Sequence, residues 1–278
     1  MLSFIITTVI TNGEELEKLG NASREVILNG SNKYKSFLLD EEVYQYASLD
    51  LSDLRIVDAT GKNIPYYIID GYDTLIGFKI TKTLPYHIKN EGQQTNISVK
   101  NEEHLKISSI TVEANGTFKR DYRVVGINAE GENERVEVGN IYNLEFKKSH
   151  TRDTEIKVKR DARYSEIKIS IDNKDDAPLD IKEIKIGYVR DKVVFAADGK
   201  APYMLWYGNL VALKPSYDIE RYKSYIKEQD LCSLGKVVVH KDKGDTLQGA
   251  QKGQILFNSL LVITTGVIII VLLKRLKK

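Results

Sequence analysis

This chain has only one cysteine, Cys232, among its 278 residues. A single cysteine cannot form an intrachain disulfide, and it cannot supply a cysteine-rich zinc site. An excess of one charge is also lacking, because 41 basic and 39 acidic residues leave a formal net charge of +2. Such a balanced chain has no general electrostatic attraction to nucleic acid, so we expect no nucleic-acid partner.

Motifs that commonly carry catalysis or cofactor binding are missing as well. The sequence has no GxSxG, no P-loop and no GxGxxG after a strand. Four histidines are present, without HxH or HExxH spacing: His87, His104, His150 and His240. The acidic runs at 40–42 and 172–176 fit solvated loops better than a glycosidase pair or a calcium site, which stay minor alternatives. We therefore predict no catalytic residue, no metal and no cofactor.

One long uncharged stretch lies near the C-terminal end. Residues 255–273, bounded by Ile255 and Leu273, are dominated by isoleucine, leucine and valine. A helix of this length spans roughly 28 Å, close to the thickness of a bilayer's hydrocarbon core. We therefore predict one C-terminal transmembrane helix and expect the lipid bilayer as a partner.

The residues that follow this stretch predict its orientation. The basic residues Lys274, Arg275, Lys277 and Lys278 fill most of the tail 274–278. Because positive residues favour the cytoplasmic side of a membrane, we expect a cytoplasmic tail and a body outside the cell. Residues 1–12 are either an incomplete secretory signal, apolar but lacking a basic start, or a simple N-terminal strand.

Short apolar runs separated by turn residues predict an all-β fold for the body. Ile167, Ile169 and Ile171 alternate with polar neighbours, which is typical of antiparallel sheets with one buried face. Asn115-Gly116 is the strongest hairpin signal. We predict two antiparallel β-sandwich domains, 13–92 and 93–197, and then an aromatic segment, a short helix and a juxtamembrane stalk over 198–254.

The 198–254 segment has two notable features. Residues 218–231 predict the helix, because Ile219, Tyr222 and Ile226 recur at helical spacing. Tyr203, Trp206 and Tyr207 form an aromatic group that could stack on a sugar. Packing in a core or domain interface is the simpler interpretation of that group, so it is a weak ligand-binding candidate.

Two stretches carry a family resemblance. Residues 51–66 read LSDLRIVDATGKNIPY, and residues 203–209 read YMLWYGN. Both resemble signatures of a bacterial membrane-anchored family catalogued as domain of unknown function 3999. The resemblance implies a signal-led β-rich ectodomain with one C-terminal span, and it brings no established activity. This sequence departs from the family pattern at its N-terminus, where the signal is incomplete.

A second resemblance, at the level of the fold, involves the middle of the chain. Residues 118–124, FKRDYRV, and 163–173, RYSEIKISIDN, are similar to strands of discoidin-like, galactose-binding-like sandwiches. The tryptophan that these domains often carry before Arg135 is absent. We interpret the arginines of these stretches as structural, because fold analogy does not supply function.

Three hypotheses for function follow from these observations. The first is a single-pass membrane protein whose extracytoplasmic β-sandwich module binds an envelope glycan or a protein. The second is an accessory subunit or enzyme of cell-envelope polysaccharide metabolism, which would need two convergent carboxylates. The third is a structural scaffold in a membrane assembly.

Overall fold

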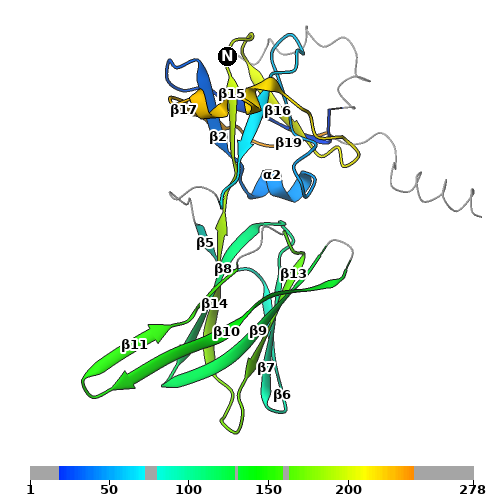
Figure 1. Cartoon of the computed structure of the whole chain (residues 1–278). Helices are drawn as coiled ribbons and strands as arrows, with labels where there is room; N and C mark the ends of the chain where they lie inside the picture. The colour runs from blue at the N-terminus through cyan, green and yellow to red at the C-terminus, as the bar shows by residue number, and fades with distance from the viewer. Residues whose placement is uncertain (1–18, 73–79, 129–130, 159–162, 241–278) are drawn as a thin grey trace, which may run out of the picture. The chain divides into compact units, whose positions relative to one another are not determined.

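The computed structural model describes residues 19–72, 80–128, 131–158 and 163–240. The predicted signal segment, transmembrane helix and basic tail lie outside these residues. Within the described ranges, no helix is long and apolar enough to cross a membrane. The described chain is mostly β-strand, arranged in four sheets, which confirms the all-β prediction (Figure 1).

Ten consecutive strands form two of the sheets. The six-stranded sheet has the order β11-β10-β9-β13-β7-β6, and a four-stranded sheet has the order β12-β8-β14-β5. We call these strands the isoleucine-rich region. Their bounds are β5 Ile80–Lys82, β6 Tyr86–Glu91, β7 Gln94–Lys100, β8 Lys106–Asn115, β9 Phe118–Ile127, β10 Asn133–Phe146, β11 Ser149–Asp153, β12 Glu155–Lys157, β13 Glu166–Asp172 and β14 Asp180–Val189.

Period-two alternation builds the core of the isoleucine-rich region. Ile167, Ile169 and Ile171 of β13 are fully buried, while the residues between them are exposed or half-buried. Ile184 and Ile186 of β14 are buried in the same way and belong to the same hydrophobic cluster. The two sheets therefore bury their apolar faces in a common core, in a sandwich-like arrangement.

The Asn115-Gly116 turn has a different role from the predicted hairpin. Gly116 has a φ of +85°, as a tight turn at this position requires. However, β8 before the turn pairs with β12 and β14, whereas β9 after it pairs with β10 and β13. Because both edges of β8 are already paired, the turn carries the chain from one sheet to the other.

The remaining elements come from both ends of the described chain. The strand order β18-β1-β16-β3 forms one sheet, with β19 also paired to β1, and β17-β2-β15-β4 forms another. We call these elements the tyrosine-rich region. Their bounds are β1 Ala22–Ile27, β2 Tyr34–Leu38, α2 Glu41–Tyr46, β3 Arg55–Val57, β4 Tyr66–Ile69, β15 Lys192–Ala196, β16 Tyr203–Tyr207, β17 Asp230–Leu231, β18 Ser233–Leu234 and β19 Val238–Val239.

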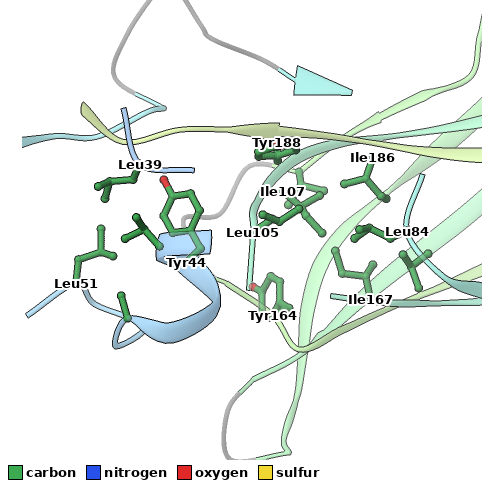
Figure 2. Packing of buried hydrophobic residues seen from close by; sticks show 14 of the residues in the cluster. Leu39, Tyr44, Leu51, Leu84, Leu105, Ile107, Tyr164, Ile167, Ile186 and Tyr188 are labelled. Atoms are coloured by element: carbon green, nitrogen blue, oxygen red, sulfur yellow. The ribbon is translucent and has the colours of Figure 1, made fainter. Parts of the chain in front are cut away.

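Aromatic rings connect the two sheets of the tyrosine-rich region. The ring of Phe195 on β15 lies 6.1 Å from that of Phe37 and 5.5 Å from that of Tyr203. The short helix α2 begins after Asp40, whose side chain accepts a hydrogen bond from the Val43 N–H as an N-cap. Figure 2 shows Tyr44 of α2 among the buried side chains.

The predicted helix over 218–231 is wrong. Two short 3₁₀ turns, Asp218–Glu220 and Lys223–Tyr225, occupy its first half, and β17 occupies its end. Ile219 and Ile226 pack with Tyr67 and Val194, and β17 pairs in parallel with β2. Pairing with the open edge of β2 and separate burial of the two isoleucines outweigh the local helical pattern.

Candidate interaction surface

The aromatic residues that the sequence offers for stacking lie inside the protein. Tyr203, Trp206 and Tyr207 belong to β16 and are 1%, 6% and 0% exposed. Burial raises the pKa of the Tyr207 phenol above its ordinary value. This burial favours the packing interpretation, because the three rings present almost no surface on which a sugar could stack.

The two stretches that carry the family resemblance are neighbours in the structure. β3 lies in the first stretch and β16 in the second, and the two strands pair antiparallel with Val57 opposite Met204 and Arg55 opposite Trp206. Residues about 150 positions apart in sequence therefore form one structural unit. The segment that follows β16 carries exposed apolar side chains.

That segment is a tight turn with exposed aliphatic side chains, which we call the aliphatic loop (residues 209–213). The Ala212 N–H donates to the carbonyl oxygen of Asn209 at 2.9 Å and closes the turn. Leu210, Val211 and Leu213 are 64%, 89% and 85% exposed. The loop therefore places three large apolar side chains in solvent on an ordered backbone.

A buried carboxylate fixes the start of the aliphatic loop. Asp53 is 0% exposed, and its Oδ2 accepts a hydrogen bond from the Gly208 N–H at 2.6 Å. Its Oδ1 accepts from the N–H and the hydroxyl of Ser48, at 3.0 and 2.7 Å. Gly208 has a φ of +93° and lies against Asn21, so a side chain here would be strained and crowded. Asp53 thus joins two turns that are distant in sequence.

The end of the aliphatic loop is held by the same LSDLR stretch. The Ser52 hydroxyl donates to the carbonyl oxygen of Ala212 at 3.1 Å. The Arg55 guanidinium donates to the carbonyl oxygen of Leu213 at 2.7 Å. These hydrogen bonds hold the two backbone carbonyls toward the protein, while the apolar side chains stay in solvent.

The six-stranded sheet presents a second surface, which we call the polar face. Alternation directs one residue in two away from the core, and the pairings align these residues across neighbouring strands. Arg123 lies opposite Ser170, Ser170 opposite Asn96, and Asn96 opposite Lys89. Lys89 and Arg123 are exposed, whereas Asn96 and Ser170 are half-buried. Amide, hydroxyl and cationic groups therefore form a continuous row on the polar face.

The hydrogen bonds and ion pairs within this row leave the Arg123 side chain available. The Ser170 hydroxyl donates to Asn96 Oδ1 at 2.8 Å, and Lys89 pairs with Glu91. Arg123 makes no ion pair or hydrogen bond with any other residue in the described ranges, which differs from the structural role expected for it from sequence. Its guanidinium can therefore donate to a bound hydroxyl, carboxylate or phosphate oxygen.

The acidic loop at 172–176 pairs its carboxylates with neighbouring groups. Asp176 lies 3.0 Å from the Arg120 guanidinium, and Asp175 accepts from the Gln93 amide at 3.0 Å. Lys174 forms an ion pair with Asp121 at 3.2 Å. Among the residues that the structure describes, no group of histidine, cysteine, aspartate and glutamate side chains could hold a metal ion.

Arg163 has a structural position, in keeping with its interpretation from sequence. Its guanidinium donates to the carbonyl oxygens of Leu49 and Ser48 and lies 5.2 Å from the centre of the Tyr44 ring. It is 7% exposed. Burial and the nearby Arg163 charge lower the pKa of His104. Arg163 thus links the segment that precedes β13 to the turn that contains Ser48 and Leu49.

A buried polar cluster was not foreseen from sequence. Lys106 Nζ lies 2.9 Å from both Asp191 Oδ1 and Asp70 Oδ2, and the Tyr44 hydroxyl donates to Asp191 Oδ2 at 3.0 Å. Burial, followed by the Asp191 charge, raises the pKa of Tyr44. The lysine is fully engaged with two carboxylates, so the cluster joins segments and offers no free base. Its members are too far apart in sequence to form a motif.

Comparison with known proteins assigns no family. No family model and no curated protein matches this chain. Among solved structures, similarity is found to a variant of CpGH89 from Clostridium perfringens in complex with its substrate GlcNAc-alpha-1,4-galactose, with 11% identity and a TM-score of 0.23. That match covers 42% of this chain but only 12% of CpGH89. The infectious bursal disease virus Gx strain gives 12% identity, a TM-score of 0.16, and coverage of 63% and 46%. Scores this low carry no argument about function.

Proposed function

We propose that this chain is a single-pass membrane protein that holds a glycan-binding β module outside the cell. The predicted transmembrane stretch 255–273 and the basic residues after it supply the anchor and its orientation. The two sheets of each region would form one β-sandwich domain. The resemblance to domain of unknown function 3999 supports this plan.

The observation that carries the glycan proposal is the row on the polar face. Lys89, Asn96, Ser170 and Arg123 lie side by side on four neighbouring strands and point away from the core. Strands lie about 4.8 Å apart, so the row extends for roughly 14 Å. A hydroxyl-rich polymer offers donors and acceptors along such a length, and an amide, a hydroxyl and two cations can bind them.

Binding of the full chain to purified insoluble envelope polysaccharide tests this proposal. The detergent-solubilised protein is sedimented with the polysaccharide and compared with the double variant Asn96→Ala/Arg123→Ala. Losing hydrogen bonds made by an amide and a charged group lowers affinity by about tenfold or more.

The matched control is Thr111→Ala/Lys185→Ala. These two residues lie opposite each other on β8 and β14, in the four-stranded sheet, and each is half-buried. We expect the control to bind like the unaltered chain. Equal binding by both double variants, or no binding by the unaltered chain, would contradict the glycan proposal.

A further inference from the structure

The aliphatic loop exposes apolar surface that a protein normally covers. Leu210, Val211 and Leu213 lie in one short turn and are each more than half exposed. Single exposed apolar residues are common, but a group of them marks a surface that leaves water on binding. The occupant must therefore offer an apolar environment.

Several backbone groups of the loop are already hydrogen-bonded within the protein. The N–H groups of Val211 and Ala212 both donate to Asn209, at 3.3 Å to its side chain and 2.9 Å to its carbonyl oxygen. The carbonyls of Ala212 and Leu213 are paired with Ser52 and Arg55, as described above. Unpaired backbone groups oppose entry into lipid, and these four are already paired.

Strand pairing places the start of the loop and the chain that leaves β18 beside the same strand. Ala22, at the start of β1, lies opposite Tyr207, just before the loop. On the other edge of β1, Leu234 lies opposite Val26, and the antiparallel direction carries the chain after β18 toward Ala22. The Gly235 N–H donates to the carbonyl oxygen of Glu25 at 2.8 Å, which continues this path. The chain therefore leaves β18 toward the end of β1 at which the loop begins.

The length of chain after the described residues limits how far the β-rich body can lie from the bilayer. Fourteen residues, 241–254, separate the last described residue from the predicted transmembrane stretch, which begins at Ile255. Even fully extended, they reach at most about 50 Å. Lys214, which follows the loop, is exposed and suited to lipid headgroups.

We propose that the aliphatic loop inserts Leu210, Val211 and Leu213 into the outer surface of the bilayer that holds the transmembrane helix. The inference rests on the anchor in the proposed function and is independent of the polar face. The loop gives the protein a second attachment, which restricts rotation of the β-rich body about its tether.

Fluorescence of the full chain reconstituted in lipid vesicles tests the loop directly. Cys232 is 7% exposed and is replaced by serine, and Val211→Cys then carries an environment-sensitive fluorophore. Phe146→Cys is the control, because Phe146 is 63% exposed at the end of β10. We expect the label at 211 to shift to the blue, to be quenched several-fold more by quenchers on lipid chains than the label at 146, and to resist iodide.

Two results would overturn the inference. Equal quenching of both labels by iodide would show that the loop stays in water. Protection of the label at 211 from iodide and from lipid quenchers alike would show that a protein surface covers it. Alkaline extraction of the same vesicles separates the proposed anchor from the proposed loop insertion. Protein that stays with the vesicles supports the anchor, whatever the fluorescence shows for the loop. Protein that is released refutes the anchor and the inference together.

Discussion

The isoleucine-rich and tyrosine-rich regions use different interactions to build similar sheets. The first buries alternating aliphatic side chains such as Ile169 and Ile186, each 0% exposed. The second buries aromatic rings together with charged groups, among them Asp53 and the pair between Lys35 and Asp230 at 2.7 Å. Aliphatic packing depends on volume, whereas a buried charge depends on every hydrogen bond that it makes.

This difference explains where each region presents the surface that we propose for binding. In the isoleucine-rich region, regular alternation leaves a row of polar side chains on the six-stranded sheet. In the tyrosine-rich region, buried polar groups hold an irregular turn, the aliphatic loop, in a fixed shape. The same chain can therefore offer a hydrophilic surface and an apolar one, each supported by a different kind of core.

The largest expected effect is loss of the buried carboxylate in Asp53→Ala. It removes three hydrogen bonds and leaves the N–H groups of Ser48 and Gly208 buried without their acceptor. We expect the free energy of unfolding to fall by about 3 to 5 kcal/mol. Urea unfolding of the full chain in detergent, followed by Trp206 fluorescence, measures this change.

Asp50→Ala is the control for that variant. Asp50 is in the same stretch and accepts hydrogen bonds from Ser48 and Ser52, but it is exposed. We expect a loss of about 1 kcal/mol or less, because water replaces its hydrogen bonds. Equal losses from the two variants would remove the distinction between a buried polar core and a solvated turn.

The next largest effect is expected from a cavity in the isoleucine-rich region. Ile169→Ala should lower the free energy of unfolding by about 2 to 4 kcal/mol, and Ile169→Val by about 1 kcal/mol, in proportion to the volume removed. Far-UV circular dichroism during urea unfolding detects the loss of the sheets. Similar costs for the alanine and valine variants would show that packing volume does not dominate this core.

The smallest effect concerns pH and the turn at 58–61. Burial acts to raise the pKa of the Asp58 carboxyl, but hydrogen bonds from Thr60, Lys200 and Lys62 outweigh it and hold the pKa at about 2. The ionised form is therefore favoured by folding. Its contribution, about 1 to 2 kcal/mol, is complete above the unfolded pKa near 4 and is lost as pH falls through about 2.

Comparison with Asp58→Asn over the range pH 2 to 7 isolates this contribution. We expect the unaltered chain to be more stable near neutral pH and the difference to shrink as the pH approaches 2. A difference that stays constant over the range would mean that the charge of Asp58 is not responsible.

The sequence predicted the isoleucine-rich region better than the tyrosine-rich one. Alternation at 167–171 is a local signal, and β13 occupies Glu166–Asp172 as expected. The pairing of β1 with β16 joins residues about 180 positions apart, and the sequence of neither strand indicates which strand it pairs with. The failed helix at 218–231 has the same cause, because the edge of β2 that β17 joins is distant in sequence.

The aromatic group and the aliphatic loop also differ in how much of them could be predicted from the sequence. The aromatic group at 203–207 was visible in sequence and was interpreted as packing, and the position of β16 between β1 and β3 accounts for its burial. No turn was predicted at 209–213 from the sequence. Only the structure explains this turn: Ser52 and Arg55 donate hydrogen bonds to its end, Asp53 accepts one from its start, and the apolar side chains stay in solvent.

Protease digestion of intact cells tests the central claim most directly, because both proposed surfaces require the β-rich body to lie outside. With a tag placed after Lys278, we expect added protease to remove the body and to leave a small tagged membrane fragment that contains residues 255–278. Disrupting the cells should be needed before the tag itself is degraded. Survival of the full-length chain in intact cells, with digestion only after disruption, would contradict the account.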